Sequence, residues 1–280
     1  MRRAETEGFK PIPVTVPGAS PWRFALRCVV DLQLATIVKP LRPALEHLPP
    51  GTVLDVGAGQ SPWRGWLPAH CRYVGLDVAN AGDFGMARGG DITYYDGKTI
   101  PFAPETFDAA LCVEVLEHAQ EPDVLIAEIA RVLKAGAPLL LTVPWSARRH
   151  HIPFDFHRFT RERLQAILVT HGFTDVTVEE RGDDLAVIAN KLLVLAIRLQ
   201  KSVSLKNFIA TVPLGLLFGA FAGVMLAIAH VSLALELGGR EDPLGYFCRA
   251  RKGRPPGEVA SPGSTSESVS KAARPTCSFD

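Results

Sequence analysis

Short apolar runs alternate with helical segments between residue 51 and about residue 178, and this alternation constrains the fold more than any other feature of the sequence. A strand, helix, strand order favours a parallel sheet. The strand-like runs are apolar throughout, which is typical of strands covered by helices on both faces. We expect strands at residues 52–56, 72–77, 92–95, 108–113 and 138–143, and helices at residues 121–133 and 160–171.

The segments on either side differ in composition from this α/β core. Residues 1–20 are rich in proline and polar groups, whereas apolar residues at helical spacing from Trp22 predict one or two helices over the edge of the core. Pro40 and Pro43 are expected to limit the length of these helices. We predict an extended arm (1–20), a helical cover (21–50), the core (51–183), an apolar helical insertion (184–242), a closing strand of the core (243–253) and a disordered tail (254–280).

Charge and cysteine content argue against two classes of protein. The formal net charge is +1 and the basic clusters are short, so we predict no nucleic-acid partner. The five cysteines are far apart and form no CxxC pair, which favours reduced thiols in a cytoplasmic protein. Pro11, Pro13 and Pro17 interrupt the N-terminal region where a secretion signal needs a continuous apolar stretch.

A glycine-rich turn follows the first predicted strand. Asp55, Gly57 and Gly59 stand at its end, and the two glycines let the backbone turn sharply and approach a ligand closely. The next strand ends at Asp77, about 20 residues further on, where a carboxylate can bind both hydroxyls of a ribose. A helix cap is the alternative role for Asp77. The third glycine of a dinucleotide fingerprint is missing, and Pro62 follows instead, which argues against a dinucleotide dehydrogenase.

The order of these and later motifs resembles the class I S-adenosylmethionine-dependent methyltransferases, in the branch that methylates small molecules, glycans and lipids (type 11-like). The resemblance covers residues 51 to about 173 and includes the segments 96–102, 105–108, 114–118 and 131–136. It implies a Rossmann-like, mostly parallel seven-stranded sheet with helices on both faces, here with an apolar helical hairpin inserted before the last strand. It also implies S-adenosylmethionine as cofactor, with Asp55, Gly57 and Gly59 shaping the pocket for the methionine end, Asp77 holding the ribose, Asp96 the adenine, and Glu114 beside the sulfonium.

Histidines supply candidate catalytic residues, because a hydroxyl or amine acceptor needs a group that takes its proton. His118 is the first candidate, although a role in bracing its loop is the alternative. The loop at residues 148–160 resembles an element of bacterial methyltransferases of polysaccharide or cell-envelope pathways, which implies that His151, Asp155 and Arg158 shape the acceptor site. A salt bridge that only fixes the next helix is the alternative for the last two. The spacing of His150, His151 and His157 fits no standard zinc pattern, so we predict no metal site.

The insertion contains two apolar stretches, and the second is long enough to cross a bilayer. A single crossing conflicts with the closing strand, which must return to the side of the core. A hairpin that dips into one leaflet or lies in the interface is consistent with this, with Arg198, Lys201 and Lys206 near its turn. The alternative is a soluble cap or a dimer interface, since Gly215, Gly219 and Gly223 permit close helix approach.

The sequence thus predicts an enzyme that transfers a methyl group by in-line displacement to an oxygen or nitrogen of a small-molecule, glycan or lipid-linked acceptor. The alternative is a membrane-tethered protein that binds S-adenosylmethionine or acts as a scaffold without turnover. The expected partners are the acceptor and either a membrane surface or a second copy of the chain. We expect a cytoplasmic location that includes peripheral contact with the inner face of the cell membrane. The acceptor molecule does not follow from the sequence.

Overall fold

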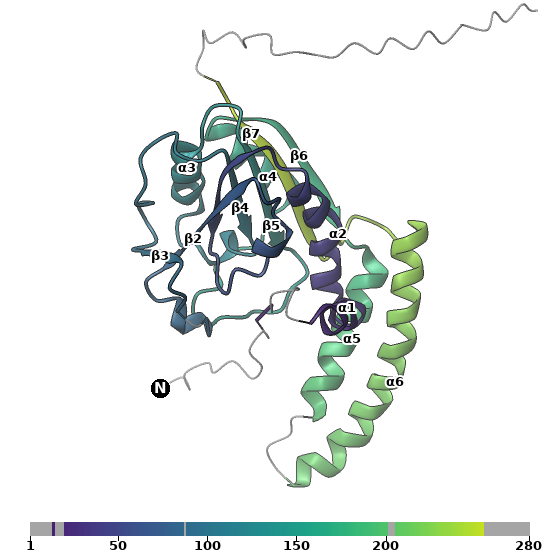
Figure 1. The fold of residues 1–280 in the computed structure, drawn as a ribbon. Coiled ribbons are helices and arrows are strands. Elements are labelled where there is room, and N and C mark those ends of the chain that lie inside the picture. The colour runs from purple at the N-terminus through teal and green to yellow at the C-terminus, as the bar shows by residue number, and fades with distance from the viewer. Residues whose placement is uncertain (1–12, 15–19, 87, 201–204, 255–280) are drawn as a thin grey trace, which may run out of the picture.

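A seven-stranded sheet forms the centre of the computed structural model, which describes residues 13–14, 20–86, 88–200 and 205–254 (Figure 1). The strand order is β3-β2-β1-β4-β5-β7-β6, and β7 runs antiparallel to both of its neighbours while the other strands are parallel. This confirms the predicted fold class. The strands are β1 (Gly51–Val56), β2 (Cys71–Val78), β3 (Ile92–Tyr95), β4 (Ala109–Val113), β5 (Pro138–Pro144), β6 (Phe173–Arg181) and β7 (Gly245–Lys252).

Helices cover both faces of the sheet, and successive strand residues alternate between them. On one face, Leu54 and Cys112 pack with residues of α3 and α4, and on the other Val53 and Leu111 pack with residues of α2. Period-two alternation of side chains explains how strands that are apolar throughout fill two separate cores. The helices are α1 (Pro21–Val30), α2 (Leu32–Glu46), α3 (Pro122–Val132), α4 (Arg161–Thr170), α5 (Asp184–Gln200) and α6 (Leu205–Leu235), with short 3-10 turns η2 (Arg64–Trp66), η3 (Ala81–Phe84) and η4 (Leu116–His118).

Helix α2 departs from the sequence-based prediction in two ways. It contains both Pro40 and Pro43 and continues to Glu46, so the prolines do not limit its length. It also lies on a face of the sheet rather than at its edge, because Leu41 and Leu45 are fully buried against the sheet. Burial of this apolar stripe outweighs the loss of two backbone hydrogen-bond donors, as tertiary packing supplies most of the stability of a helix.

Strand β6 has no counterpart among the predicted strands. Its residues alternate between buried and exposed without a continuous apolar run, because it is the outermost strand of the sheet. An edge strand with one solvated face gives a weaker apolar signal than a central one. The predicted arm lies mostly outside the described residues, and so does the predicted tail from residue 255.

Helices α5 and α6 pack side by side as an antiparallel hairpin that extends away from the sheet (Figure 1). The hairpin leaves β6 and returns into β7, and these two strands are neighbours in the sheet. Its base is fixed by the buried Asp183, which accepts hydrogen bonds from the backbone of Ala186 in α5 and from the hydroxyl of Ser232 in α6. Both ends of the hairpin therefore lie on the same side of any surface into which its tip inserts.

Arg181, the last residue of β6, is 2% exposed and reaches across two strands to the end of β4. Its guanidinium donates to the carbonyls of Tyr246 (3.1 Å) and Val143 (3.1 Å) and forms an ion pair with Glu114 (2.7 Å). The path of this side chain is open because residue 245 is a glycine: a Cβ there would overlap both the guanidinium and the carbonyl oxygen of Val143.

We therefore expect Gly245→Ala to lower the free energy of unfolding by about 1–3 kcal/mol, the usual range for inserting a carbon into a packed interior. Urea unfolding followed by circular dichroism measures the change. Gly65→Ala is the matched control, because a Cβ at Gly65 meets no atom within 4 Å. Equal stability of the two variants would contradict the packing role of Gly245.

Candidate active site

A cavity of about 310 Å³ lies at the carboxyl ends of the parallel strands. Strands β1 and β4 are neighbours there, whereas β2 and β3 lie on the other side of β1, so the order of the strands reverses at this point although all four run in the same direction. Ligands of open α/β sheets bind at this kind of crevice. Among the residues that line it are Gly57, Gly59, Asp77, Phe84, Tyr95, Asp96, Glu114, His118, His151, Phe154 and Phe156.

The glycine-rich turn forms one wall of the cavity. Gly57 and Gly59 have φ values of 72° and 52°, which side chains with a Cβ rarely adopt. The backbone N–H groups of Gly57 and Ala58 donate to the carbonyl of Leu76, and the N–H of Gly59 donates to the carboxylate of Asp77 at 2.9 Å. The turn is thus tied to the end of β2, which places Asp77 and the glycines on the same wall.

Asp77 is the last residue but one of β2, Asp96 directly follows the neighbouring strand β3, and both line the cavity. Asp77 is 8% exposed, and its burial raises the pKa of its carboxyl. Asp96 lies in the loop after β3, where its Oδ1 accepts the backbone N–H groups of Thr99 and Lys98. These hydrogen bonds lower the pKa of Asp96 and fix its orientation. Two carboxylates therefore border the same end of the cavity.

Asp55 lies beside this wall and is absent from the cavity lining. It is 2% exposed, and its Oδ2 accepts a hydrogen bond from the hydroxyl of Tyr73 at 2.8 Å. Burial raises the pKa of Asp55 to about 7, and the nearby charge of Asp77 adds to this shift against the effect of the Tyr73 hydrogen bond. Asp55 therefore ties the end of β1 to β2 through Tyr73, and its role in the pocket for the methionine end stays a prediction.

Glu114 follows β4 and faces the cavity from the opposite side of the glycine turn. Its φ of 54° is unusual for a residue with a side chain. The carboxylate Oε1 accepts hydrogen bonds from Thr142 at 2.9 Å and from Arg181 at 2.7 Å. Two buried residues, Thr142 and Arg181, hold this side chain, so its position in the cavity wall is fixed before any ligand binds.

Histidines border the other end of the cavity. His118 ends η4, and His151 lies in the loop after β5; the rings of both contact Phe84, with centroids 5.6 and 5.4 Å apart. The Nδ1 of His118 lies 2.7 Å from the carbonyl oxygen of Phe154, which makes it the protonated nitrogen. Burial lowers the pKa of His118 to about 4. The neutral imidazole thus presents Nε2 as an acceptor.

Asp155 and Arg158 do not line the cavity. Arg158 donates to both oxygens of Asp155, at 2.6 and 2.9 Å, and also to the carbonyl oxygens of His157 and Arg148. The second oxygen of Asp155 accepts the backbone N–H of His150 as well. These contacts brace the loop that carries His150 and His151, so the two residues influence the cavity through the loop.

Sequence reasoning missed two charged residues of this region. Arg181 holds Glu114 in place, and a lone arginine at the end of an unpredicted edge strand gives no signal of that role. Glu117 is fully buried beside the histidines, although it lies in the segment 114–118 that carried the resemblance. Its spacing of three residues from Glu114 was the available signal.

The fold and cavity define an α/β domain that binds a nucleotide-like ligand at the carboxyl ends of its strands. Residues 54–141 match the family described as "Methyltransferase domain". The chain therefore contains a class I S-adenosylmethionine-dependent methyltransferase domain, and S-adenosylmethionine is the cofactor of this domain class. The matched range includes the glycine turn, Asp77, Asp96, Glu114 and His118.

Two curated relatives share part of this domain. The chain is 33% identical over 110 residues to tRNA (carboxymethyluridine(34)-5-O)-methyltransferase of Arabidopsis thaliana, a match that covers 38% of this chain and 27% of that protein. It is 35% identical over 98 residues to fatty-acid O-methyltransferase of Mycolicibacterium smegmatis, covering 32% of this chain and 36% of that protein. A crystal structure of a methyltransferase from Archaeoglobus fulgidus matches with 16% identity and a TM-score of 0.47, over 82% of this chain and 100% of that one.

The raised pKa of Asp55 predicts a pH-dependent stability. A carboxyl whose folded-state pKa lies near 7 and whose usual value is 3.8 favours folding below about pH 4, and this contribution is lost as the pH rises through 7. Asp55→Asn keeps an acceptor for Tyr73 and cannot ionise. We expect the stability of the variant relative to the unmodified chain to rise by about 1–3 kcal/mol between pH 5 and pH 8.

Urea unfolding at the two pH values measures this difference. Asp91→Asn is the control, because Asp91 lies at the surface, where it pairs with Arg64. If Asp55→Asn and the unmodified chain lost the same amount of stability between pH 5 and pH 8, the pH dependence could not be assigned to Asp55.

Proposed function

We propose that this chain is an enzyme that transfers a methyl group from S-adenosylmethionine to an oxygen or nitrogen of a small-molecule, glycan or lipid-linked acceptor. The observation that carries the proposal is the cavity itself. Two glycines, Asp77, Asp96 and Glu114 line it from the ends of four strands, and His118 and His151 border its other end. One end thus offers groups for a nucleoside and the other offers imidazoles.

The residues present fit the cofactor. Gly57 and Gly59 leave room for close approach to the backbone, and the carboxylate of Asp77 is oriented by the N–H of Gly59 so that it faces the cavity. In the proposed arrangement, Asp77 accepts hydrogen bonds from the ribose hydroxyls and Asp96 accepts one from the adenine amino group. Glu114 lies near the charged sulfur. When bound, S-adenosylmethionine supplies the activated methyl group.

The protein's part in the reaction is alignment and proton handling. Displacement at a methyl carbon needs the acceptor atom in line behind it, and holding two reactants in that geometry removes much of the barrier. The neutral imidazole of His118 can take a proton from an acceptor hydroxyl or amine through Nε2, because its Nδ1 is engaged with Phe154. His151 and the apolar side chains of Phe84 and Phe154 would limit the entry of water.

The acceptor class is the least constrained part of the proposal. One relative is named as acting on a fatty acid and another on tRNA, and both names describe O-methylation. The formal net charge of +1 favours the first kind of acceptor over a nucleic acid, because a phosphate backbone is bound mainly through positive charge.

Cofactor binding tests the proposal directly. We expect calorimetry to report one S-adenosylmethionine per chain. Asp77→Ala should bind it at least about 10-fold more weakly, because two ribose hydrogen bonds contribute more than about 1.4 kcal/mol. The surface control Asp91→Ala should bind it unchanged. Labelled methyl transfer to lipid, glycan and RNA fractions of a cell extract then identifies the acceptor class. Tight binding without transfer to any fraction would favour a binding or scaffolding protein, and absence of binding would refute the proposal.

We further propose that the α5–α6 hairpin attaches the enzyme to a membrane surface. Among the described residues, α6 contains one segment, Thr211–Leu235, that is long and apolar enough to span a bilayer, with a mean hydropathy of 2.2 and 17% of its most apolar window buried. A core helix of this hydropathy would be mostly buried. Leu217, Phe221 and Val224 are each more than half exposed on one side of α6.

The topology favours shallow insertion of the hairpin over a single crossing, because β6 and β7 join the same sheet. Gly215 packs closely against Leu199 and Gln200 of α5, so the first of the three glycines serves contact within the hairpin. A Cβ at Gly223 would meet no atom within 4 Å, which leaves that position open to lipid or to a second copy of the chain.

We expect the full chain to float with vesicles of phosphatidylcholine and phosphatidylglycerol in a density gradient. The triple variant Leu217→Ser, Phe221→Ser, Val224→Ser should stay largely unbound, because each change removes about 1.5–3 kcal/mol of apolar burial in the lipid. Val169→Ser, at an exposed apolar residue of α4, is the control. A chain that fails to float and sediments as a dimer would favour the dimer interface, and a monomer that fails to float would refute both.

A further inference from the structure

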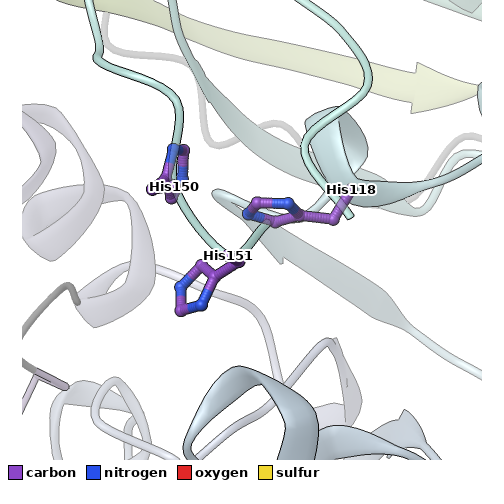
Figure 2. Close-up of side chains that lie close together, drawn as sticks. All are labelled: His118, His150 and His151. Atoms are coloured by element: carbon purple, nitrogen blue, oxygen red, sulfur yellow. The ribbon is translucent and has the colours of Figure 1, made fainter. Parts of the chain in front are cut away.

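Three histidines from two segments meet at the acceptor end of the cavity. His118 comes from η4, and His150 and His151 come from the loop after β5 (Figure 2). One ring nitrogen from each lies within 4.8 Å of the other two. The ring centroid of His118 lies 4.9 Å from that of His150 and 5.2 Å from that of His151. Neutral imidazoles in such a group supply the nitrogen ligands of many metal sites.

A buried carboxylate adjoins this group. Glu117 is fully buried, and neither of its carboxylate oxygens has a hydrogen-bond partner among the described residues. Its Oε1 lies 3.6 Å from Nε2 of His118 and 4.0 Å from Nε2 of His150. A buried carboxylate without a partner costs several kcal/mol, and either a proton or a cation between the carboxylate and the imidazoles removes that cost.

The other nitrogens of two of these rings are already engaged. Nδ1 of His118 lies 2.7 Å from the carbonyl oxygen of Phe154, and Nδ1 of His150 lies 3.1 Å from that of Arg148. Metal-binding histidines commonly donate their second N–H to a backbone carbonyl, which fixes the tautomer and directs the free nitrogen to the metal. In both residues the free nitrogen is Nε2, the atom that faces Glu117.

We propose that His118, His150, His151 and Glu117 form a binding site for one divalent transition-metal ion of the zinc class. Ligand atoms of a tetrahedral zinc ion lie about 2.0–2.2 Å from the metal and therefore about 3.3–3.5 Å from one another. The carboxylate oxygen lies 3.6 and 4.0 Å from the two Nε2 atoms, and the three histidine nitrogens lie within 4.8 Å of one another, so the side chains must move toward one another to reach this geometry. Nitrogen and carboxylate ligands without thiolates suit zinc, cobalt, nickel and iron.

The proposed metal site explains why Asp155 and Arg158 hold the loop that carries His150 and His151. Asp155 accepts the backbone N–H of His150 and is held in turn by Arg158, so the ion pair fixes the segment that carries two of the four ligands. The sequence alone groups His150 and His151 with His157, and the spacing of these three predicts no metal site. His157 contacts Phe159 and lies outside the group of nitrogens that converge.

The position of the site suggests its use, and this step rests on the proposed function. His118 and His151 line the cavity, so the ion would border the space for the acceptor. With the ion bound, Nε2 of His118 is a ligand and no longer a proton acceptor, so the ion itself would orient a hydroxyl or carboxylate of the acceptor toward the methyl group. Metal binding itself requires no methyl transfer, so the two proposals can fail separately.

The test uses the full chain after treatment with a chelator and dialysis. We expect calorimetry with Zn²⁺, and visible absorption on titration with Co²⁺, to report one ion per chain. His150→Gln and Glu117→Gln should each weaken binding at least 10-fold, while the control His157→Gln should leave it unchanged. Thermal unfolding without metal shows whether each variant is folded.

Separate measurements of S-adenosylmethionine binding distinguish the failures. A chain that binds metal at these residues and no cofactor would refute the proposed function alone. A chain that binds cofactor but no Zn²⁺ or Co²⁺, or that binds them equally well in folded His150→Gln and Glu117→Gln, would overturn the metal site alone.

Discussion

The ion pair between the buried Arg181 and the partly exposed Glu114 is the interaction on which the rest of the structure depends. Arg181 is almost without solvent, and a buried charge is tolerated only when it is paired and its donors are satisfied. Here the donors are taken up by Glu114 and by carbonyls of β5 and β7. The pair links the outermost strand of the sheet to the residue that forms one wall of the cavity.

The same pair joins the hairpin to the candidate active site. Arg181 ends β6, and the chain enters α5 three residues later through Asp183, which also holds α6. The guanidinium lies close to α2, where Thr36 and the carbonyl of Gln33 are within 3.5 Å. The hairpin base and Glu114 are therefore both tied to the end of β6. This arrangement places the proposed membrane contact and the cavity on one continuous framework.

The two ends of the cavity are built by different means. At the nucleoside end, backbone geometry and carboxylates at strand ends are fixed by the sheet, so the turn and Asp77 hold one another in place. At the acceptor end, the histidines belong to a short turn and a loop, and their positions depend on Phe154, Asp155 and Arg158. Loops carry the variable part of function in α/β domains because the sheet does not constrain them, which agrees with a cofactor that is easier to infer than the acceptor.

The sequence by itself determined the α/β core and the glycine turn and carboxylates that line one end of the cavity. Apolar runs, a glycine turn and carboxylates at strand ends are local signals, and parallel strands bring their carboxyl ends together whatever the remaining contacts are. Only the tertiary structure decided the continuation of α2 through two prolines, the pairing of Arg181 with Glu114, the hydrogen bond between Tyr73 and Asp55, and the position of Glu117 beside the histidines. Each of these features either joins residues far apart in the chain or depends on whether the free energy gained by burial exceeds the local conformational preference. A local sequence pattern contains neither kind of information.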